Sequence, residues 1–257
     1  MGLTVHYDYE FEGKRKELIE ILDDIAEDIV KLRPRKVWPP VYMDKLETTP
    51  GYAHFDEDRF VRNDLGFMLL RKLEEKNPYI SKEEKMVWEA RGTLNIPNMP
   101  MPWQKKYYRI ERKATEARRK LRQKVLERGE GMALYVDVAG GCEPFTVMLA
   151  RLRGSRKWVG GSFTKTQYAK DFLRAHLMVI TMLDICNEYG ILKSVYDEGE
   201  YYETRDIKRL CRNLNANTAM LLAVGEILQE ISRRTGGKLK VQRGGVPQIV
   251  VPPAEAV

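Results

Sequence analysis

Two kinds of hydrophobic pattern divide this chain, and their order limits the folds open to it. Apolar residues alternate with polar ones from Leu3 to Phe11, and comparable strand patterning returns after Gly131. Residues 51–130 between them carry helical patterning and helix breakers. We therefore predict an α+β fold with a mostly antiparallel sheet and helices packed on one face, for which a ferredoxin-like topology is one option.

The same division predicts the domains. Residues 1–50 and 131–257 are expected to form an α+β core domain, and residues 51–130 a helical insertion. Helices are expected over about 56–75, 81–91 and 103–128, and Ser81 with Glu84 matches a capping box. Further along, an extended segment over 192–202 precedes a helix capped by Thr204, and residues 238–251 read as a closing hairpin.

The net charge of the chain is concentrated in one segment. Residues 105–130 contain eleven Lys or Arg and four Asp or Glu, a net charge of +7, which equals that of the whole chain. The other residues hold 33 basic and 33 acidic side chains, which cancel. A local excess of this size indicates a polyanionic partner.

A narrow apolar seam runs along the predicted helix that carries this charge. It consists of Tyr107, Ile110, Ala114, Ala117, Leu121 and Val125. Packing by the seam would leave a cationic face for phosphates, so we predict nucleic-acid binding without sequence-specific readout. The predicted binding residues are Lys105, Lys106, Arg109, Arg112, Lys113, Arg118, Arg119, Lys120, Arg122 and Lys124.

Aromatic residues near the start of this helix add to the prediction, because Trp103, Tyr107 and Tyr108 could stack on bases. The alternatives are a solvated face, with glutamates such as Glu116 pairing one turn away, or a face docked on an acidic protein. In the latter case the protein is a structural protein that binds a protein partner through its helical insertion.

A function of another class rests on three polar stretches, Gly140–Pro144, Ser162–Tyr168 and Asp197–Asp206, which neither alternation nor helix amphipathicity explains. If they meet in one cleft, the protein is a metal-dependent enzyme that acts on phosphate esters. Its predicted catalytic residues are Glu143, Lys165, Glu198 and Arg205. If they are separate surface loops, the enzyme hypothesis has no support, so whether the protein is an enzyme stays open.

The third stretch is rich in carboxylates. Asp197, Glu198 and Glu200 are predicted to hold Mg²⁺ or Mn²⁺, which prefer oxygen ligands. The alternative is an exposed loop before a helix whose first turn favours acidic residues.

Cysteine use and hydropathy indicate a cytoplasmic protein without membrane association. Cys142, Cys186 and Cys211 are too widely spaced for a disulfide framework or a zinc site. The first ten residues lack a signal-peptide pattern, and no apolar run is long enough to span a bilayer. A charged fraction of 32% with few amides is typical of thermophile proteins. His176 lies on a core-facing stripe and is expected to be structural.

Three segments resemble a family of uncharacterised bacterial and archaeal proteins. They are Gly2–Tyr7, Ser162–Ala169, and Asp197–Tyr201 with Arg205 and Asp206. The resemblance covers about residues 1–12 and 140–210 and excludes the basic segment. It implies a shared fold and an expected shared site, and it brings no activity.

Overall fold

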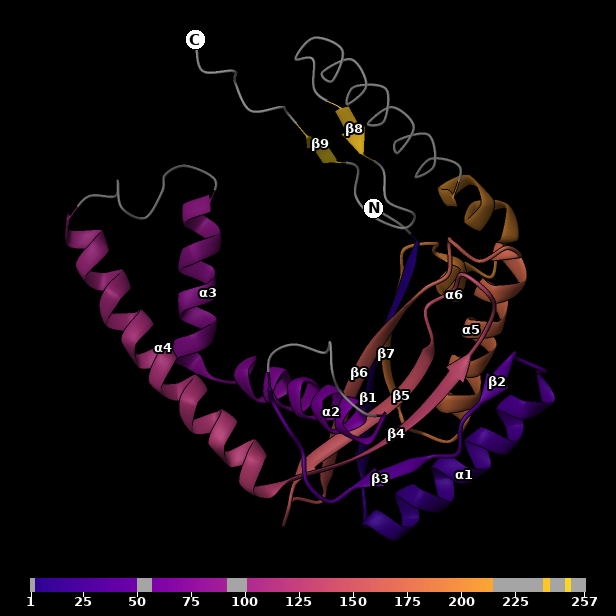
Figure 1. Ribbon diagram of the computed structural model, residues 1–257, viewed down its shortest axis with the longest axis horizontal. Coiled ribbons are helices and arrows are strands. Elements are labelled where there is room, and N and C mark those ends of the chain that lie inside the picture. The colour runs from indigo at the N-terminus through magenta and orange to yellow at the C-terminus, as the bar shows by residue number, and fades with distance from the viewer. Residues whose placement is uncertain (1–2, 50–56, 92–100, 215–237, 241–247, 251–257) are drawn as a thin grey trace. The chain divides into compact units, whose positions relative to one another are not determined.

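In the computed structural model, which describes residues 3–49, 57–91, 101–214, 238–240 and 248–250, seven strands form one sheet (Figure 1). They are β1 (Thr4–Glu12), β2 (Lys36–Val37), β3 (Val41–Met43), β4 (Gly129–Asp137), β5 (Phe145–Leu152), β6 (Lys157–Lys165) and β7 (Leu192–Asp197). The order is β2-β4-β5-β6-β1-β7, and β3 also pairs with β4. The β4–β5 and β5–β6 pairs are antiparallel.

The helices are α1 (Arg15–Lys31), α2 (Glu57–Glu74), α3 (Pro78–Arg91), α4 (Met101–Arg128), α5 (Phe172–Glu188) and the single turn α6 (Tyr201–Thr204). Residues 207–214 are also helical. A separate antiparallel pair joins β8 (Lys238–Lys240) to β9 (Gln248–Val250), as predicted for the hairpin strands. The prediction of an α+β fold with a mostly antiparallel sheet is confirmed. Its ferredoxin-like form stays a prediction.

The predicted domains stay a prediction, and contacts between residues divide the chain into two compact units. One comprises residues 1–5 and 196–257, and the other comprises residues 6–195. The predicted insertion lies in the larger unit together with most of the sheet, because α2 and the end of α4 share a hydrophobic core with β4 and β5.

Helices α1 and α5 pack together on one face of the sheet. In α1, Leu18, Leu22 and Ile29 are fully buried at helical spacing, as their periodicity predicts. In α5, Cys186 is buried next to Tyr9 of β1, which places both helices on the face to which Tyr9 points.

Helix α2 covers the other face. Its Leu65 and Leu69 share a core cluster with Ala133 of β4 and Ala150 of β5. A second close contact joins α2 to residues 47–49, where Gly66 has no room for a side chain because a Cβ there would lie 1.8 Å from the backbone oxygen of Glu47. The close approach keeps residues 47–49 on α2, where Thr49 N donates to Asn63 Oδ1 at 2.8 Å.

We therefore expect Gly66→Ala to lower the free energy of unfolding by about 2 kcal/mol. Alanine favours a helix by only about 1 kcal/mol over glycine, and the clash with a backbone atom outweighs that gain. Chemical denaturation measures the difference. Gly140→Ala is the matched control, since its nearest neighbour is the Arg35 side chain at 3.6 Å. Equal stability of the two variants would contradict the packing.

Three element boundaries differ from the sequence prediction for local reasons. Helix α3 begins at Pro78 because the Asn77 side chain accepts from Tyr79 N at 3.1 Å, so the capping box at Ser81 is wrong. Strand β7 ends at Asp197, not at residue 202. The helix over 207–214 is capped by Asp206, whose carboxylate accepts from Lys208 N at 2.8 Å, instead of by Thr204. The part of this helix predicted beyond residue 214 lies outside the described residues.

Candidate nucleic-acid interface

Four of the six residues of the predicted α4 seam are buried, and the other two, Ala117 and Leu121, are half-buried. Tyr107, Ile110, Ala114 and Val125 are each at most 8% exposed. Near the start of α4, Tyr107 and Ile110 pack with Met86 and Val87 of α3, so the two helices form a helical hairpin. Burial of Tyr107 makes its predicted stacking on bases wrong. The Trp103 side chain lies outside the described residues.

The other end of α4 is anchored to the body of the larger unit. Val125 belongs to the core cluster that contains Leu65 and Leu69 of α2. Arg122 donates from Nε to Thr48 Oγ1 at 2.9 Å and also to the Thr48 carbonyl oxygen. Helix α4 is therefore held at its end by the sheet and α2, and at its start by α3.

Four of the ten predicted nucleic-acid-binding residues have intramolecular partners. Arg118 pairs with Glu83 of α3 at 2.5 Å, and Glu83 is only 7% exposed. Arg122 is held by Thr48, as described above. Lys120 pairs with Glu116 at 2.7 Å, and the Lys113 ammonium lies 4.9 Å from the centre of the Tyr79 ring. Arg118 and Arg122 are thus parts of the scaffold.

The other six predicted residues form what we call the α4 cationic face. It consists of Lys105, Lys106, Arg109, Arg112, Arg119 and Lys124, all exposed. Within the described residues, the structure gives none of the six a side-chain hydrogen bond or ion pair. At a rise of about 1.5 Å per residue, this face extends over about 30 Å.

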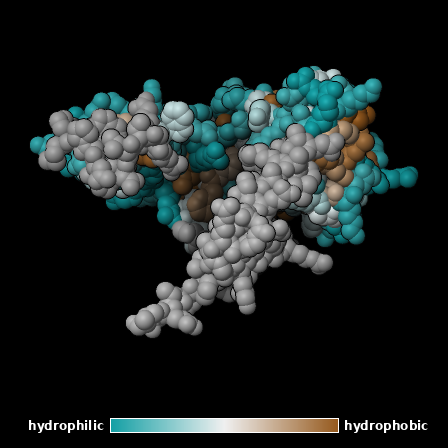
Figure 2. Space-filling view, turned by 90° about the horizontal axis from the view of Figure 1, so that it is seen from above, coloured by the Kyte–Doolittle hydropathy of each residue, from teal (hydrophilic) through white to brown (hydrophobic). Residues whose placement is uncertain are grey.

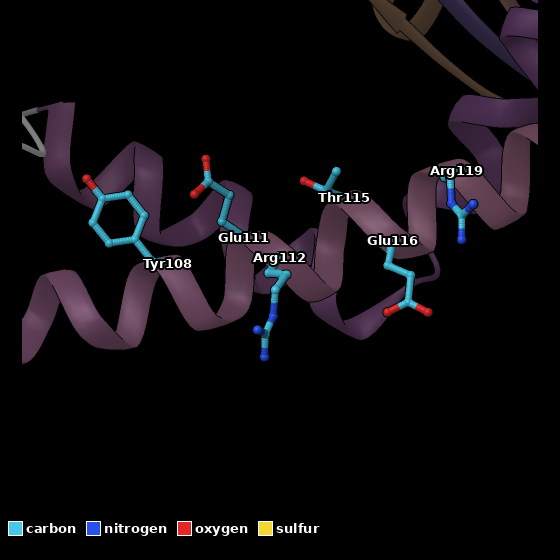
Figure 3. A pocket seen from close by; sticks show the side chains of 6 residues that line it. All are labelled: Tyr108, Glu111, Arg112, Thr115, Glu116 and Arg119. Atoms are coloured by element: carbon cyan, nitrogen blue, oxygen red, sulfur yellow. The ribbon is translucent and has the colours of Figure 1, made fainter.

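An open groove of about 520 Å³ lies along part of this face, between Tyr108 and Arg119 (Figure 3). Figure 3 shows Arg112, Glu116 and Arg119 projecting from the same side of α4. The Glu116 carboxylate reduces the positive charge there, but its hydrogen bond with Lys120 lowers its pKa and holds it in an ion pair. In the space-filling view, the visible part of the hairpin carries mainly hydrophilic residues (Figure 2).

The loop with Glu143 packs on the connection between β6 and α5. Glu143 N donates to the Lys165 carbonyl oxygen at 3.1 Å, and Glu143 Oε2 accepts from Lys165 N at 3.2 Å. The structure thus brings these two predicted catalytic residues together, with the backbone of Lys165 bonded to both the backbone and the carboxylate of Glu143. Glu198 and Arg205 belong to the other compact unit, so the single cleft stays a prediction.

Cys142 in the same loop is a poor nucleophile. Burial raises the pKa of its thiol to about 12, and the negative charges of Glu143 and Asp137 add to the shift. Because the thiolate is the reactive form, little of it exists near neutral pH.

We expect iodoacetamide at pH 8 to alkylate Cys142 far more slowly in the folded protein than after unfolding, where the pKa returns to about 8.5. The rate in the folded protein should rise with pH toward the thiol pKa of about 12. Peptide mass spectrometry resolves this residue from the other two cysteines. Equal rates in folded and unfolded protein would contradict the assigned environment.

The three predicted metal ligands each have an intramolecular partner. Asp197 is 2% exposed, and its carboxylate accepts from the backbone nitrogens of Gly199, Tyr201 and Tyr202 at 2.8–3.0 Å. This hydrogen bonding turns the chain and ends β7. Glu198 Oε2 accepts from Thr4 N at 2.9 Å, and Glu200 pairs with Arg209.

Among the described residues, no group of three His, Cys, Asp or Glu side chains is arranged to hold a metal ion. The Mg²⁺ or Mn²⁺ site therefore stays a prediction without geometric support. Arg205, the fourth predicted catalytic residue, is exposed, and its guanidinium lies 5.1 Å from the centre of the Tyr202 ring.

His176 occupies the structural position that its stripe predicts. It is fully buried, its Nδ1 lies 3.0 Å from Thr166 Oγ1, and its ring lies 5.5 Å from that of Phe172. We expect His176→Gln to lower the free energy of unfolding by about 1–3 kcal/mol, because the buried Thr166 hydroxyl would lose its well-placed hydrogen-bond partner. A thermal melt of the variant tests this, and an unchanged melting temperature would contradict a structural role.

Comparisons with protein-family models, with curated proteins and with solved structures find no match to this chain. No helix in the described parts of the chain combines the length and the apolarity that crossing a bilayer requires.

Sequence reasoning missed two residues of the hairpin. Glu83 looks like an ordinary helix-surface acid, yet it is buried against Arg118, and its place three residues before Met86 on the apolar side of α3 was the available signal. Trp88 is 76% exposed, and no pattern in the sequence distinguishes it from a core residue.

Proposed function

We propose that this protein binds the phosphate backbone of nucleic acid through the α4 cationic face, without reading sequence. The observation that carries the proposal is a row of six exposed cations that make no side-chain hydrogen bond or ion pair within the described residues. An ordinary solvated helix surface alternates charges and pairs them one turn apart. Here the pairs form mainly on the sides of α4 that face α3 or residues 47–49, and the outer side keeps its excess charge.

The length of the face suits a linear polyanion. Cations spread over about 30 Å can meet several successive phosphates, since duplex DNA carries one charge per about 1.7 Å of axis. Each contact releases counterions, which makes binding strong at low salt. The scaffold contacts of Arg118 and Arg122 fix the helix that presents these side chains, so the face is held in place before binding.

The proposal is tested by the salt dependence of binding. Fluorescence anisotropy with a labelled oligonucleotide of about 20 nucleotides gives the dissociation constant at each salt concentration. If six phosphates are contacted, affinity should fall by about a thousandfold between about 50 and 200 mM salt. Polyglutamate of similar length is the matched competitor. Competition by polyglutamate as strong as by the unlabelled oligonucleotide, or the absence of a salt dependence, would contradict the proposal.

A further inference from the structure

Two large aromatic side chains are exposed at one end of the α3–α4 hairpin. Met86 in the second half of α3 packs with Tyr107 near the start of α4, so the two helices are in contact toward this end of the hairpin. We call this end the hairpin tip. At the tip, Trp88 is 76% exposed and Tyr108 is 53% exposed.

The ring of the neighbouring residue Tyr107 restricts the movement of the Tyr108 ring. The Tyr108 ring meets the buried Tyr107 ring edge to face, with the ring centres 5.6 Å apart. Because Tyr107 is packed on α3, it restricts the positions open to Tyr108. A ring whose movement is already restricted loses little conformational entropy when a flat group stacks on it.

Three cations lie close to Tyr108 along α4. Lys105 and Arg109 lie three residues before and one residue after Tyr108, and Arg112 lies one turn further along. Tyr108, Glu111 and Arg112 all line the groove on α4, and Figure 3 shows Tyr108 and Glu111 projecting from one side of the helix and Arg112 from the other. An apolar protein partner would not gain from this charge, whereas a ligand that carries both flat rings and phosphates would.

We propose, on the basis of the function proposed above, that the hairpin tip binds single-stranded nucleic acid, with bases stacked on Tyr108 and Trp88 and phosphates on the adjacent cations. In a duplex the faces of the bases are covered by their neighbours, so exposed rings cannot stack on them. A single strand presents unstacked bases beside its phosphates, which matches the residues at the tip.

The test separates stacking from charge by comparing two ligands with the same phosphates. We would measure binding to an oligothymidine strand, to an abasic strand of equal length, and to a duplex. The wild-type protein should bind oligothymidine at least about tenfold more tightly than the abasic strand, as expected for stacking of one or two bases. Equal affinity for the two strands would overturn the proposal.

The variant that carries Trp88→Ala and Tyr108→Ala should lose this preference and keep the abasic affinity and its salt dependence. Since both side chains are exposed, its melting temperature should match that of the wild type. Tyr196→Ala removes a tyrosine that is 65% exposed and lies outside the hairpin, and it should keep the preference. A double variant that retains the preference would overturn the assignment of these rings.

Two further outcomes distinguish this inference from the function on which it rests. Salt-dependent binding that is equal for oligothymidine, abasic strand and duplex would overturn stacking and leave backbone binding standing. Absence of salt-dependent binding to any of the three would overturn both. Self-association that sedimentation detects in the wild type and that Trp88→Ala abolishes, without a preference for oligothymidine, would show that the tip is an interface between copies.

Discussion

A variant with Lys105, Arg109, Arg112 and Arg119 each replaced by Gln is expected to bind nucleic acid about a thousandfold more weakly at about 100 mM salt. These four residues recur at helical spacing on the outer side of α4, and all are exposed. Each phosphate contact contributes roughly 0.7–0.9 to the slope of log affinity against log salt. The variant should therefore also reduce that slope by about three.

The control removes the same charge elsewhere. Lys16, Lys45, Lys170 and Lys208 are exposed and lie outside α4, so their replacement by Gln lowers the net charge by the same four units. This control variant should bind within a few-fold of the wild type. If the two variants lose equal affinity, binding follows the overall charge of the protein, and the α4 cationic face has no special role.

The second large effect concerns the scaffold of the hairpin. Glu83→Ala removes the partner of Arg118, whose side chain is only 35% exposed. Breaking a buried pair costs about 3–5 kcal/mol, and we expect about 2–3 kcal/mol here because the guanidinium keeps some contact with water. The loss should appear as a lower free energy of unfolding in chemical denaturation.

The adjacent residue provides the matched control for this prediction. Glu84 lies 4.0 Å from the same guanidinium, but its side chain is 65% exposed, so Glu84→Ala should cost less than about 1 kcal/mol. Replacing both members of the buried pair with Leu should restore most of the stability, because no unpaired charge remains. Similar losses for Glu83→Ala and Glu84→Ala would contradict the buried pair.

Much of the fold follows from periodicity. Alternation predicted β1, strand patterning predicted further strands after Gly131, and the spacing of Tyr107, Ile110, Ala114 and Val125 indicated the buried side of α4. These features depend on the local sequence and on which side chains are buried, and the spacing of apolar residues along the chain reflects that burial directly. The boundaries that failed were set by single side chains, such as Asn77 and Asp197, whose hydrogen bonds compete with the pattern.

The candidate site was predictable as a charged helix but not residue by residue. Whether a cation is available for a ligand depends on what lies across from it in space. Glu83 forms an ion pair with Arg118. Thr48, more than seventy residues before Arg122 in the chain, accepts a hydrogen bond from the Arg122 guanidinium. The carboxylates near Asp197 show the same limit, because the backbone turn that Asp197 caps has no signature in composition.

Lysine footprinting tests the central claim most directly, because it locates the bound polyanion on the protein. The protein would be acetylated with and without a saturating oligonucleotide, and the rate at each lysine read by peptide mass spectrometry. We predict that Lys105, Lys106 and Lys124 are protected several-fold, while Lys16, Lys45, Lys170 and Lys208 react at unchanged rates. Equal rates at the three α4 lysines with and without the oligonucleotide, under conditions where it is bound, would contradict the α4 cationic face as the binding site.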